Sequence, residues 1–399
     1  MKRFVLKNGL TVLIKRKPTN AVAVEITVKI GSNHENSKNR GISHFLEHML
    51  FEGTKKRDAQ QIANEIESIG GEINALTDNE RTSYHIVVLH KHIERALDVL
   101  SDILQNPVFD EKIIEKERKV VLNEISLTTD DPKSHQWVLF QTKLYKKHNC
   151  RYPVYGTIEC VSKLKRKDFI DFYSKYYVPN NMIVSIVGNV DKKVLKKVES
   201  YFTFSAKPVP KMEKIVEPKT KALNFVEKRK LLHSYMVFGF RTVPRNHPDS
   251  FVFDVIRSVL GRGQSSKMFQ EIRTKRGLAY VVGTHYESGA DYGWMAVYVG
   301  TSKKNLKKVR DIIVKEFNNL RNLSNNDLRD AINFIEGDYL LSNEDNHVSA
   351  DNMSVWEIIG KPYTFEGYVR NIKKIKRADV KRVVKKYFKN PVCVTIKQV

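Results

Sequence analysis

The chain has 399 residues, of which 41% are hydrophobic and 29% are charged, so it is long enough to bury the cores of two domains or more. Lysine and arginine (69) outnumber aspartate and glutamate (45), giving a net charge of +24, but the lysines follow amphipathic helical patterns and accompany no nucleic-acid-binding motif. No apolar run approaches the length of a membrane span, and three cysteines without a C-x-x-C pair argue against a disulfide scaffold. We therefore expect a cytoplasmic protein with no nucleic-acid partner and no membrane association.

The first half of the chain alternates strand-like and helix-like segments. Strands are predicted at residues 4–14 (with a turn at Asn8-Gly9), 21–30, 71–77, 82–89 and 181–187. Amphipathic helices are predicted around residues 42–50, 58–68, 91–104 and 110–128, with a closing helix near Tyr201. This mixture of short strands and helices predicts an α+β unit.

Residues 44–48, His-Phe-Leu-Glu-His, are the most informative segment of the chain. At about 100° per residue, a helix places His48 roughly 40° from His44, and Glu47 roughly 60° away on the other side. The two imidazoles then point the same way with a carboxylate beside them, which suits a zinc ion that keeps one position open for water. Ser43 is a candidate N-cap for this helix. Taken alone, the pentapeptide also fits an ordinary pair of surface or core histidines.

A third ligand is needed, because catalytic zinc usually takes three protein side chains. The predicted helix 110–128, DEKIIEKERKVVLNEISLT, begins with acidic residues. Glu117 and Glu124 lie seven residues apart, so they share one face of this helix at a distance of two turns. By themselves these glutamates also fit a solvated charged face.

The second half of the chain echoes the first. Residues 206–221 carry three prolines and many charges without apolar periodicity, and we interpret them as a linker. Beyond it, residues 268–283 repeat the helix–glycine–strand pattern of 62–77, and the helical pattern at 302–317 parallels that at 90–104. We therefore predict an N-terminal domain over 1–205 and a homologous C-terminal domain over 222–399. The second domain has no His-x-x-Glu-His, so one metal ion per chain is expected.

The zinc-ligand segments resemble those of a known family. G-I-S-H-F-L-E-H-M-L-F-E-G-T (41–54) is similar to the active-site segment of the pitrilysin-type zinc peptidases, which include the mitochondrial processing peptidase beta subunit and insulin-degrading enzyme. E-R-K-V-V-L-N-E-I (117–125) resembles the segment that carries the third ligand of that family. The resemblance implies Glu124 as the third zinc ligand and Glu117 as a supporting acidic residue. It also implies two α/β-roll units, each a mostly antiparallel sheet packed with helices.

A further segment resembles the family's substrate-binding strand. G-G-E-I-N-A-L-T (70–77) is similar to the edge strand to which an extended peptide adds. The match implies that Asn74, Ala75 and Thr77 pair with the substrate.

The second domain carries a resemblance of its own. R-T-K-R-G-L-A-Y (273–280) is similar to the family's second-domain motif, in which an arginine and a tyrosine lie seven residues apart. The match implies Arg273 and Tyr280 as donors to the substrate carbonyl. Arg276 is a nearby alternative arginine that the spacing does not favour.

The resemblance implies a zinc-dependent endopeptidase that hydrolyses peptides or small unfolded segments within a clamshell chamber. His44, His48 and Glu124 are expected to hold one Zn²⁺, and Glu47 is expected to act as the proton acceptor. Because the family builds its chamber from two halves of about this length, a homodimer is expected, or a heterodimer with a paralogue. The alternatives are a non-catalytic structural subunit of the same family and, less favoured, a basic nucleic-acid-binding protein.

Overall fold

The computed structural model describes residues 1–210 and 215–399, which form two compact units. Unit 1 contains residues 1–127, the described part of 152–214, and 342–365. Unit 2 contains residues 128–151, 215–341 and 366–399. The predicted linker 206–221 contains no helix or strand over 206–210 and 215–221, and its residues 211–214 lie outside the described residues.

The sheet of unit 1 has six strands in the order β1-β2-β6-β3-β5-β4. The strands are β1 (Lys2–Val5), β2 (Thr11–Arg16), β3 (Ala21–Val28), β4 (Glu72–Thr77), β5 (Thr82–Leu89) and β6 (Met182–Gly188). Only the β2–β6 pair is parallel, and the other neighbours are antiparallel. The strands predicted from the sequence are confirmed, including the turn that divides 4–14 into two strands. Strand β4 is an edge strand of this sheet.

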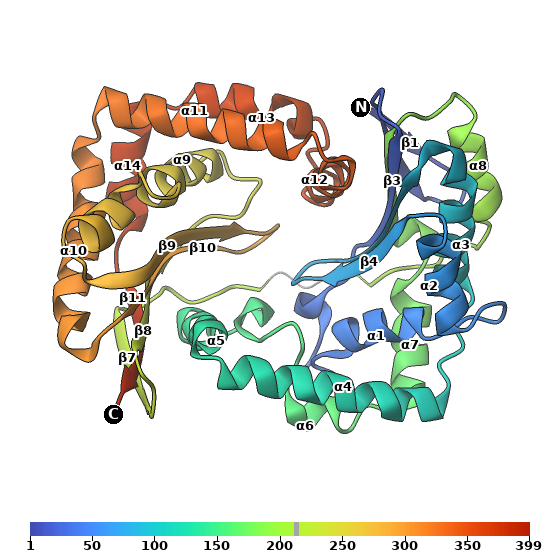
Figure 1. Ribbon diagram of the computed structural model, residues 1–399, viewed down its shortest axis with the longest axis horizontal. Helices are drawn as coiled ribbons and strands as arrows, with labels where there is room; N and C mark the ends of the chain where they lie inside the picture. Colours follow the sequence, from blue (N-terminus) through green and yellow to red (C-terminus); the bar gives the residue numbers. More distant parts are fainter. Residues whose placement is uncertain (211–214) are drawn as a thin grey trace. The chain divides into compact units, whose positions relative to one another are not determined.

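Two kinds of layer cover the sheet of unit 1. Figure 1 shows α3 and α8 on one side of the strands and α12 on the other. The helices are α1 (Ile42–Phe51), α2 (Ala59–Glu67), α3 (Ile93–Gln105), α4 (Glu111–Asp130), α6 (Ile158–Val161), α7 (Arg166–Tyr176), α8 (Val194–Tyr201) and α12 (Asn346–Ile358). The apolar faces of α1 and α3 form one core with the valines and isoleucines of the strands, because both helices repeat apolar residues at helical spacing.

The face of this sheet under α12 is unusually polar. Ser185 on β6 and Ser354 on α12 share a hydrogen bond of 2.9 Å, and the guanidinium of Arg81 bonds the carboxylate of Asp351 at 2.5 Å. His347 of α12 lies 3.4 Å from the buried carboxylate of Glu25 on β3. These paired polar groups fix the position of α12 on the sheet, which apolar packing alone would not determine.

Unit 2 repeats the topology of unit 1 without its first strand. Its strands are β7 (Leu223–Arg229), β8 (Ser234–Arg241), β9 (Ala279–Ser288), β10 (Gly293–Thr301) and β11 (Val392–Gln398), in the order β7-β11-β8-β10-β9. The one parallel pair is β7–β11, which corresponds to β2–β6. Its helices are α5 (Pro132–Leu144), α9 (Ser250–Gly261), α10 (Leu306–Asn319), α11 (Asn325–Ser342), α13 (Thr364–Lys373) and α14 (Arg377–Tyr387). The predicted duplication of one α+β unit is therefore confirmed.

The units are not contiguous in the sequence. Helix α5 follows α4 in the first half of the chain but packs on β8 and β11 of unit 2, where Phe140 joins the core. Helix α12 comes from the second half but packs on β3 and β6 of unit 1. The boundaries expected from the sequence, 1–205 and 222–399, differ from the compact units at these two helices. The difference arises because each helix buries its apolar face against a sheet that is distant in the sequence. Local patterns show that a helix has an apolar face, but they do not show which sheet covers it.

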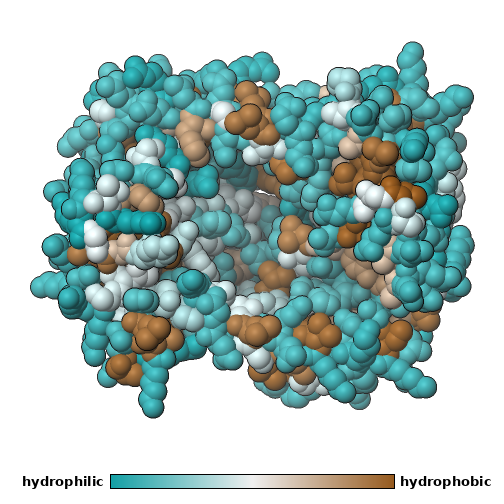
Figure 2. Space-filling view, viewed as in Figure 1, coloured by the Kyte–Doolittle hydropathy of each residue, from teal (hydrophilic) through white to brown (hydrophobic). Residues whose placement is uncertain are grey.

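No helix in the described ranges is long and apolar enough to cross a membrane. Figure 2 shows that most of the visible surface is hydrophilic, with apolar side chains in scattered groups. The three cysteines, Cys150, Cys160 and Cys393, are buried and free.

Candidate metal centre and its surroundings

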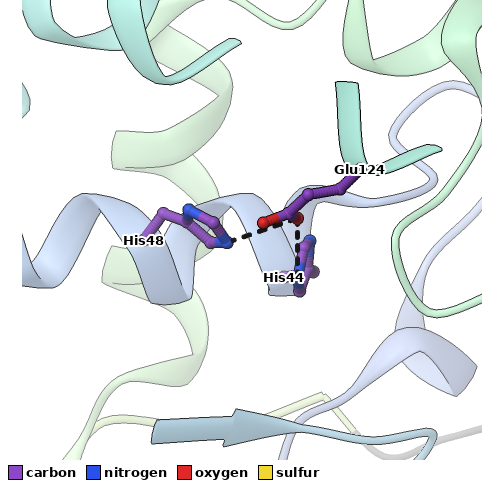
Figure 3. Close-up of side chains that lie close together, drawn as sticks. All are labelled: His44, His48 and Glu124. Carbon is purple, nitrogen blue, oxygen red and sulfur yellow. Dashed lines mark ion pairs between the residues drawn. The ribbon is translucent and has the colours of Figure 1, made fainter. Parts of the chain in front are cut away.

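Helix α1 presents two histidines on one face. The rings of His44 and His48 lie 4.8 Å apart between centroids, in an edge-to-face arrangement (Figure 3). Burial lowers the pKa of His44 to about 4, and the neighbouring His48 acts in the same direction. His44 is therefore a neutral imidazole at physiological pH, which is the form that ligates a metal ion.

Helix α4 brings the third side chain from a distant part of the sequence. Glu124 Oε2 lies 3.7 Å from His44 Nε2 and 3.8 Å from His48 Nε2. In the described part of the chain, these three residues are the one group of histidine, cysteine or acidic side chains with metal-binding geometry, their ligand atoms lying within 4.8 Å of one another.

The separations fit a zinc ion. They are too long for hydrogen bonds, yet they are close to the edge of a tetrahedron with metal–ligand bonds of 2.0–2.1 Å, which is about 3.4 Å. Two imidazole nitrogens and one carboxylate oxygen form the donor set that catalytic zinc accepts. The predicted trio is thus brought together by the fold, and its chemistry suits the expected metal.

Glu47 lies beside the trio on α1, and a threonine holds its carboxylate. Thr77 Oγ1, at the end of β4, donates a short hydrogen bond to Glu47 Oε2. Burial raises the pKa of Glu47, and the Thr77 hydrogen bond opposes this effect. A carboxylate with a raised pKa can both take up and release a proton, which a general acid–base group must do.

Glu117 is the second acidic residue of α4 at this site. Its Oε2 lies 3.4 Å from Nδ1 of His48, the ring nitrogen that faces away from Glu124. Its Oε1 lies 3.5 Å from Nζ of the exposed Lys116. Glu117 is buried, and its contact with Nδ1 orients the His48 ring. Carboxylates commonly orient metal-ligating histidines in this way.

The start of α1 depends on a residue that the sequence analysis missed. Glu35 is 5% exposed, and its carboxylate accepts the backbone N–H groups of Gly41 (2.8 Å) and Ser43 (2.9 Å). The prediction that Ser43 caps the helix is wrong, because the N-cap is Gly41 at φ 94° and no side chain of the cap accepts a hydrogen bond. Burial raises the pKa of Glu35 to about 7, although both N–H donors favour the ionised form. No spacing rule reveals this contact, because it comes from an irregular loop.

Strand β4 presents a free edge next to α1. At the hairpin, the N–H of Asp78 donates to the carbonyl of Arg81 (2.9 Å), so the even-numbered residues of β4 bond to β5. The odd-numbered residues, including Ala75 and Thr77, therefore turn their N–H and C=O groups to the free edge. The N–H of Ala75 donates to its neighbour Asn74 Oδ1 (2.8 Å), which occupies one position on that edge.

Arg273 and Tyr280 lie together in unit 2. Arg273 belongs to the short π-helical segment η5 (Phe269–Thr274), and Tyr280 is the second residue of β9. The guanidinium of Arg273 lies 4.7 Å from the ring centroid of Tyr280. Tyr280 is 80% exposed. Arg276, by contrast, is paired with Glu271 at 2.6 Å.

The chain matches known proteins along nearly its whole length. A protein of Bacillus subtilis called "Uncharacterized zinc protease YmxG" is 30% identical over 393 residues, covering 97% of this chain and 96% of that protein. An "Uncharacterized zinc protease" of Rickettsia felis is 37% identical over 305 residues, covering 76% of this chain and 74% of the relative. A solved structure titled as a protease from Helicobacter pylori superposes with a TM-score of 0.94 at 24% identity, covering 99% of each chain, and supports the fold.

Two family descriptions divide the chain in a way that agrees with the single metal centre. Residues 10–158, which contain His44, His48, Glu117 and Glu124, match "Insulinase (Peptidase family M16)". Residues 163–334 match "Peptidase M16 inactive domain", and this region has no His-x-x-Glu-His. The chain therefore belongs to peptidase family M16, the insulinase or pitrilysin-type family of zinc proteases.

Proposed function

We propose that this protein is a zinc-dependent endopeptidase that hydrolyses peptides or small unfolded segments bound in an extended conformation. The observation that carries the proposal is the convergence of His44, His48 and Glu124 beside Glu47. Two relatives that are named zinc proteases, and that match 97% and 76% of this chain, support it.

His44, His48 and Glu124 are proposed to hold one Zn²⁺. When bound, zinc supplies a Lewis acid that activates water and stabilises negative charge on the carbonyl oxygen of the substrate. The neutral state of His44 favours this use, because a half-buried imidazole that does not protonate keeps its nitrogen lone pair.

Glu47 is proposed as the general base and acid. It lies on the same helix as both histidines, one residue before His48, so its carboxylate flanks the metal position. Glu47 takes the proton of the attacking water and later transfers it to the leaving amine. Glu117 keeps the His48 ring in place through the 3.4 Å contact with Nδ1.

The free edge of β4 is proposed to bind the substrate backbone. A peptide that adds as a strand pairs with the outward N–H and C=O groups of Ala75 and Thr77, and its carbonyl replaces Asn74 Oδ1 at the Ala75 N–H. Recognition through backbone groups makes little use of substrate side chains, so broad sequence specificity is expected.

Arg273 and Tyr280 are proposed to donate hydrogen bonds to the substrate carbonyl near the reacting bond. The exposed Tyr280 and the guanidinium beside its ring support this role. In keeping with the processing-peptidase-like arrangement of two half-chambers, we propose a homodimer, or a pair with a paralogue, in which one chain's Tyr280 serves the metal centre of the other. Mixing Glu47→Gln chains with Tyr280→Phe chains, each weak alone, then restores activity. Absence of recovery at saturating mixing ratios contradicts completion between chains.

A reducing, cytoplasmic location is proposed from the cysteines, because Cys150, Cys160 and Cys393 are all free and buried. Thiol titration of the protein purified from its native source, with and without denaturant, tests this. Three titratable thiols only after unfolding support the proposal, and a disulfide between any two opposes it.

The decisive experiment combines metal analysis with cleavage of a quenched fluorescent peptide. The protein is expected to carry one zinc per chain and to lose activity to a chelator and regain it with Zn²⁺. Glu47→Gln abolishes turnover and keeps the metal, whereas Glu67→Gln, a surface change on α2, retains full activity. Cleavage by purified Glu47→Gln at the wild-type rate rules Glu47 out as the base, and a folded protein that takes up no metal excludes the proposed enzyme.

A further inference from the structure

Thr77 contacts two parts of the site at once. Its backbone N–H and C=O face the free edge of β4, because odd-numbered residues of this strand turn away from β5. Its side chain points to the buried face of β4, together with Ile73 and Ala75, which pack against the core. That buried face meets α1, where Glu47 is located.

The hydroxyl of Thr77 has one proton, and the best acceptor within reach is Glu47 Oε2, an acid oxygen. On its other side, Thr77 Oγ1 lies 3.4 Å from Thr82 Oγ1, and Thr82 in turn donates to the carbonyl of Ile30 (3.0 Å). Thr82 is fully buried, so this chain of contacts ties the threonine hydroxyl to the interior of the sheet.

The contact leaves the two oxygens of Glu47 unequal. Oε2 is held by Thr77, whereas Oε1 has no hydrogen-bond partner within the part of the chain that the structure describes. A glutamate on a helix has three rotatable side-chain bonds, and one fixed oxygen removes most of that freedom. Oε1 is thereby left in one orientation and available to take a proton.

We infer that Thr77 is a positioning residue that aligns Glu47 for proton transfer and links that alignment to occupancy of the β4 edge. This inference rests on the proposed peptidase function. A peptide strand that bonds to the backbone of Thr77 fixes the same residue whose hydroxyl holds the base, so productive binding and base alignment occur together. The role differs from the one implied by the family resemblance, in which Thr77 serves only to pair with the substrate.

The test compares Thr77→Val with Thr77→Ser in the full-length, zinc-loaded protein. Valine keeps the shape and loses the hydroxyl, and serine restores the hydroxyl. Misalignment of a catalytic group by an ångström costs about 100-fold in rate, so Thr77→Val is expected to lower kcat by about 10- to 100-fold with little change in KM. Thr77→Ser is expected to recover most of kcat. Zinc content and Tm should stay near wild-type values in both variants.

A matched control is Thr11→Val, another buried threonine-to-valine change in the same sheet. Strand β2 lies four strands from β4, at roughly 19 Å, and should leave kcat unchanged. A rise in KM with unchanged kcat in Thr77→Val overturns the inference, since it identifies Thr77 as a substrate contact alone. Equal loss of kcat in the valine and serine variants, accompanied by loss of zinc or a fall in Tm, also overturns it in favour of a structural role.

A second readout does not depend on activity. Crystal structures of wild type and Thr77→Val at matched resolution are expected to show a single Glu47 carboxylate orientation in wild type and several in the variant. An identical, well-ordered Glu47 in both refutes the inference. If the wild-type protein binds zinc but cleaves no peptide, the proposed peptidase function is refuted. The crystallographic comparison still decides whether Thr77 orients Glu47.

Discussion

The buried carboxylate at the start of α1 should contribute stability that is lost as pH rises toward neutrality. Glu35 has its pKa raised by burial from the usual 4.5 to about 7. At this site the folded protein therefore holds a proton that the unfolded chain has lost between about pH 4.5 and 7, so the contribution of Glu35 to stability decreases as pH rises through that window. A shift of this size corresponds to about 3 kcal/mol, because each pKa unit is worth about 1.4 kcal/mol.

Glu35→Gln isolates this effect. The glutamine carbonyl can accept one of the two N–H groups of Gly41 and Ser43, and it has no proton to titrate. The free energy of unfolding of wild type relative to the variant is expected to fall by about 3 kcal/mol from pH 4.5 to pH 8, equivalent to about 6–12 °C in Tm for a unit of this size. All other residues are the same in both proteins, so contributions from outside the Glu35 site cancel in the difference.

The assay is thermal or urea unfolding of the two zinc-loaded proteins in a pH series. A surface variant, Glu67→Gln, provides the control and should follow wild type at every pH. Parallel wild-type and Glu35→Gln curves, or a difference that grows in favour of wild type with pH, refute the reasoning about Glu35.

Three further outcomes are expected. Glu117→Gln should weaken zinc binding about 10- to 100-fold, measured by competition with a chromogenic chelator, because it loosens the His48 ring; unchanged affinity contradicts that role. Arg81→Met should destabilise unit 1 by about 1–3 kcal/mol in urea unfolding, because it leaves the half-buried carboxylate of Asp351 without its partner; a loss below 1 kcal/mol argues against this anchor of α12. Removing zinc with a chelator should lower the free energy of unfolding of wild type by about 3 kcal/mol or more; the reference is protein with free zinc at about 100 times the dissociation constant. An unchanged Tm contradicts metal binding at this site.

Local patterns were sufficient to predict the strands of unit 1, the ligand helix and the duplicated topology. Alternating and helical apolar spacing reports which face of a segment is buried, and the His-Phe-Leu-Glu-His order fixes the relative directions of three side chains on any regular helix. Glu124 and Glu117 were predicted on one helix face, and the fold brings both to the histidines. The shared helix faces are local information, since they depend on residues within a few turns, whereas the approach of α4 to α1 comes from the fold.

The contacts of Glu35 and Thr77 could not be predicted in the same way. Glu35 reaches α1 through an irregular loop, and the Thr77 hydroxyl meets Glu47 across 30 positions of sequence. Their partners are chosen by how a loop and an edge strand pack against a helix, and any of several neighbouring polar residues would satisfy the same sequence pattern.

By itself, the sequence determined the secondary structure of each half, the repeat and the shared helix faces of the two histidines and of Glu117 and Glu124, because periodicity and residue chemistry act over short distances; the choice of Glu124 as the third ligand came from the family resemblance. Only the tertiary structure decided that α5 and α12 are exchanged between the two sheets, that Glu35 holds the start of α1, and that Thr77 holds the carboxylate of Glu47. The physical reason is that burial of an apolar face or a polar hydrogen requires a complementary partner, and only the folded chain selects that partner from many distant candidates.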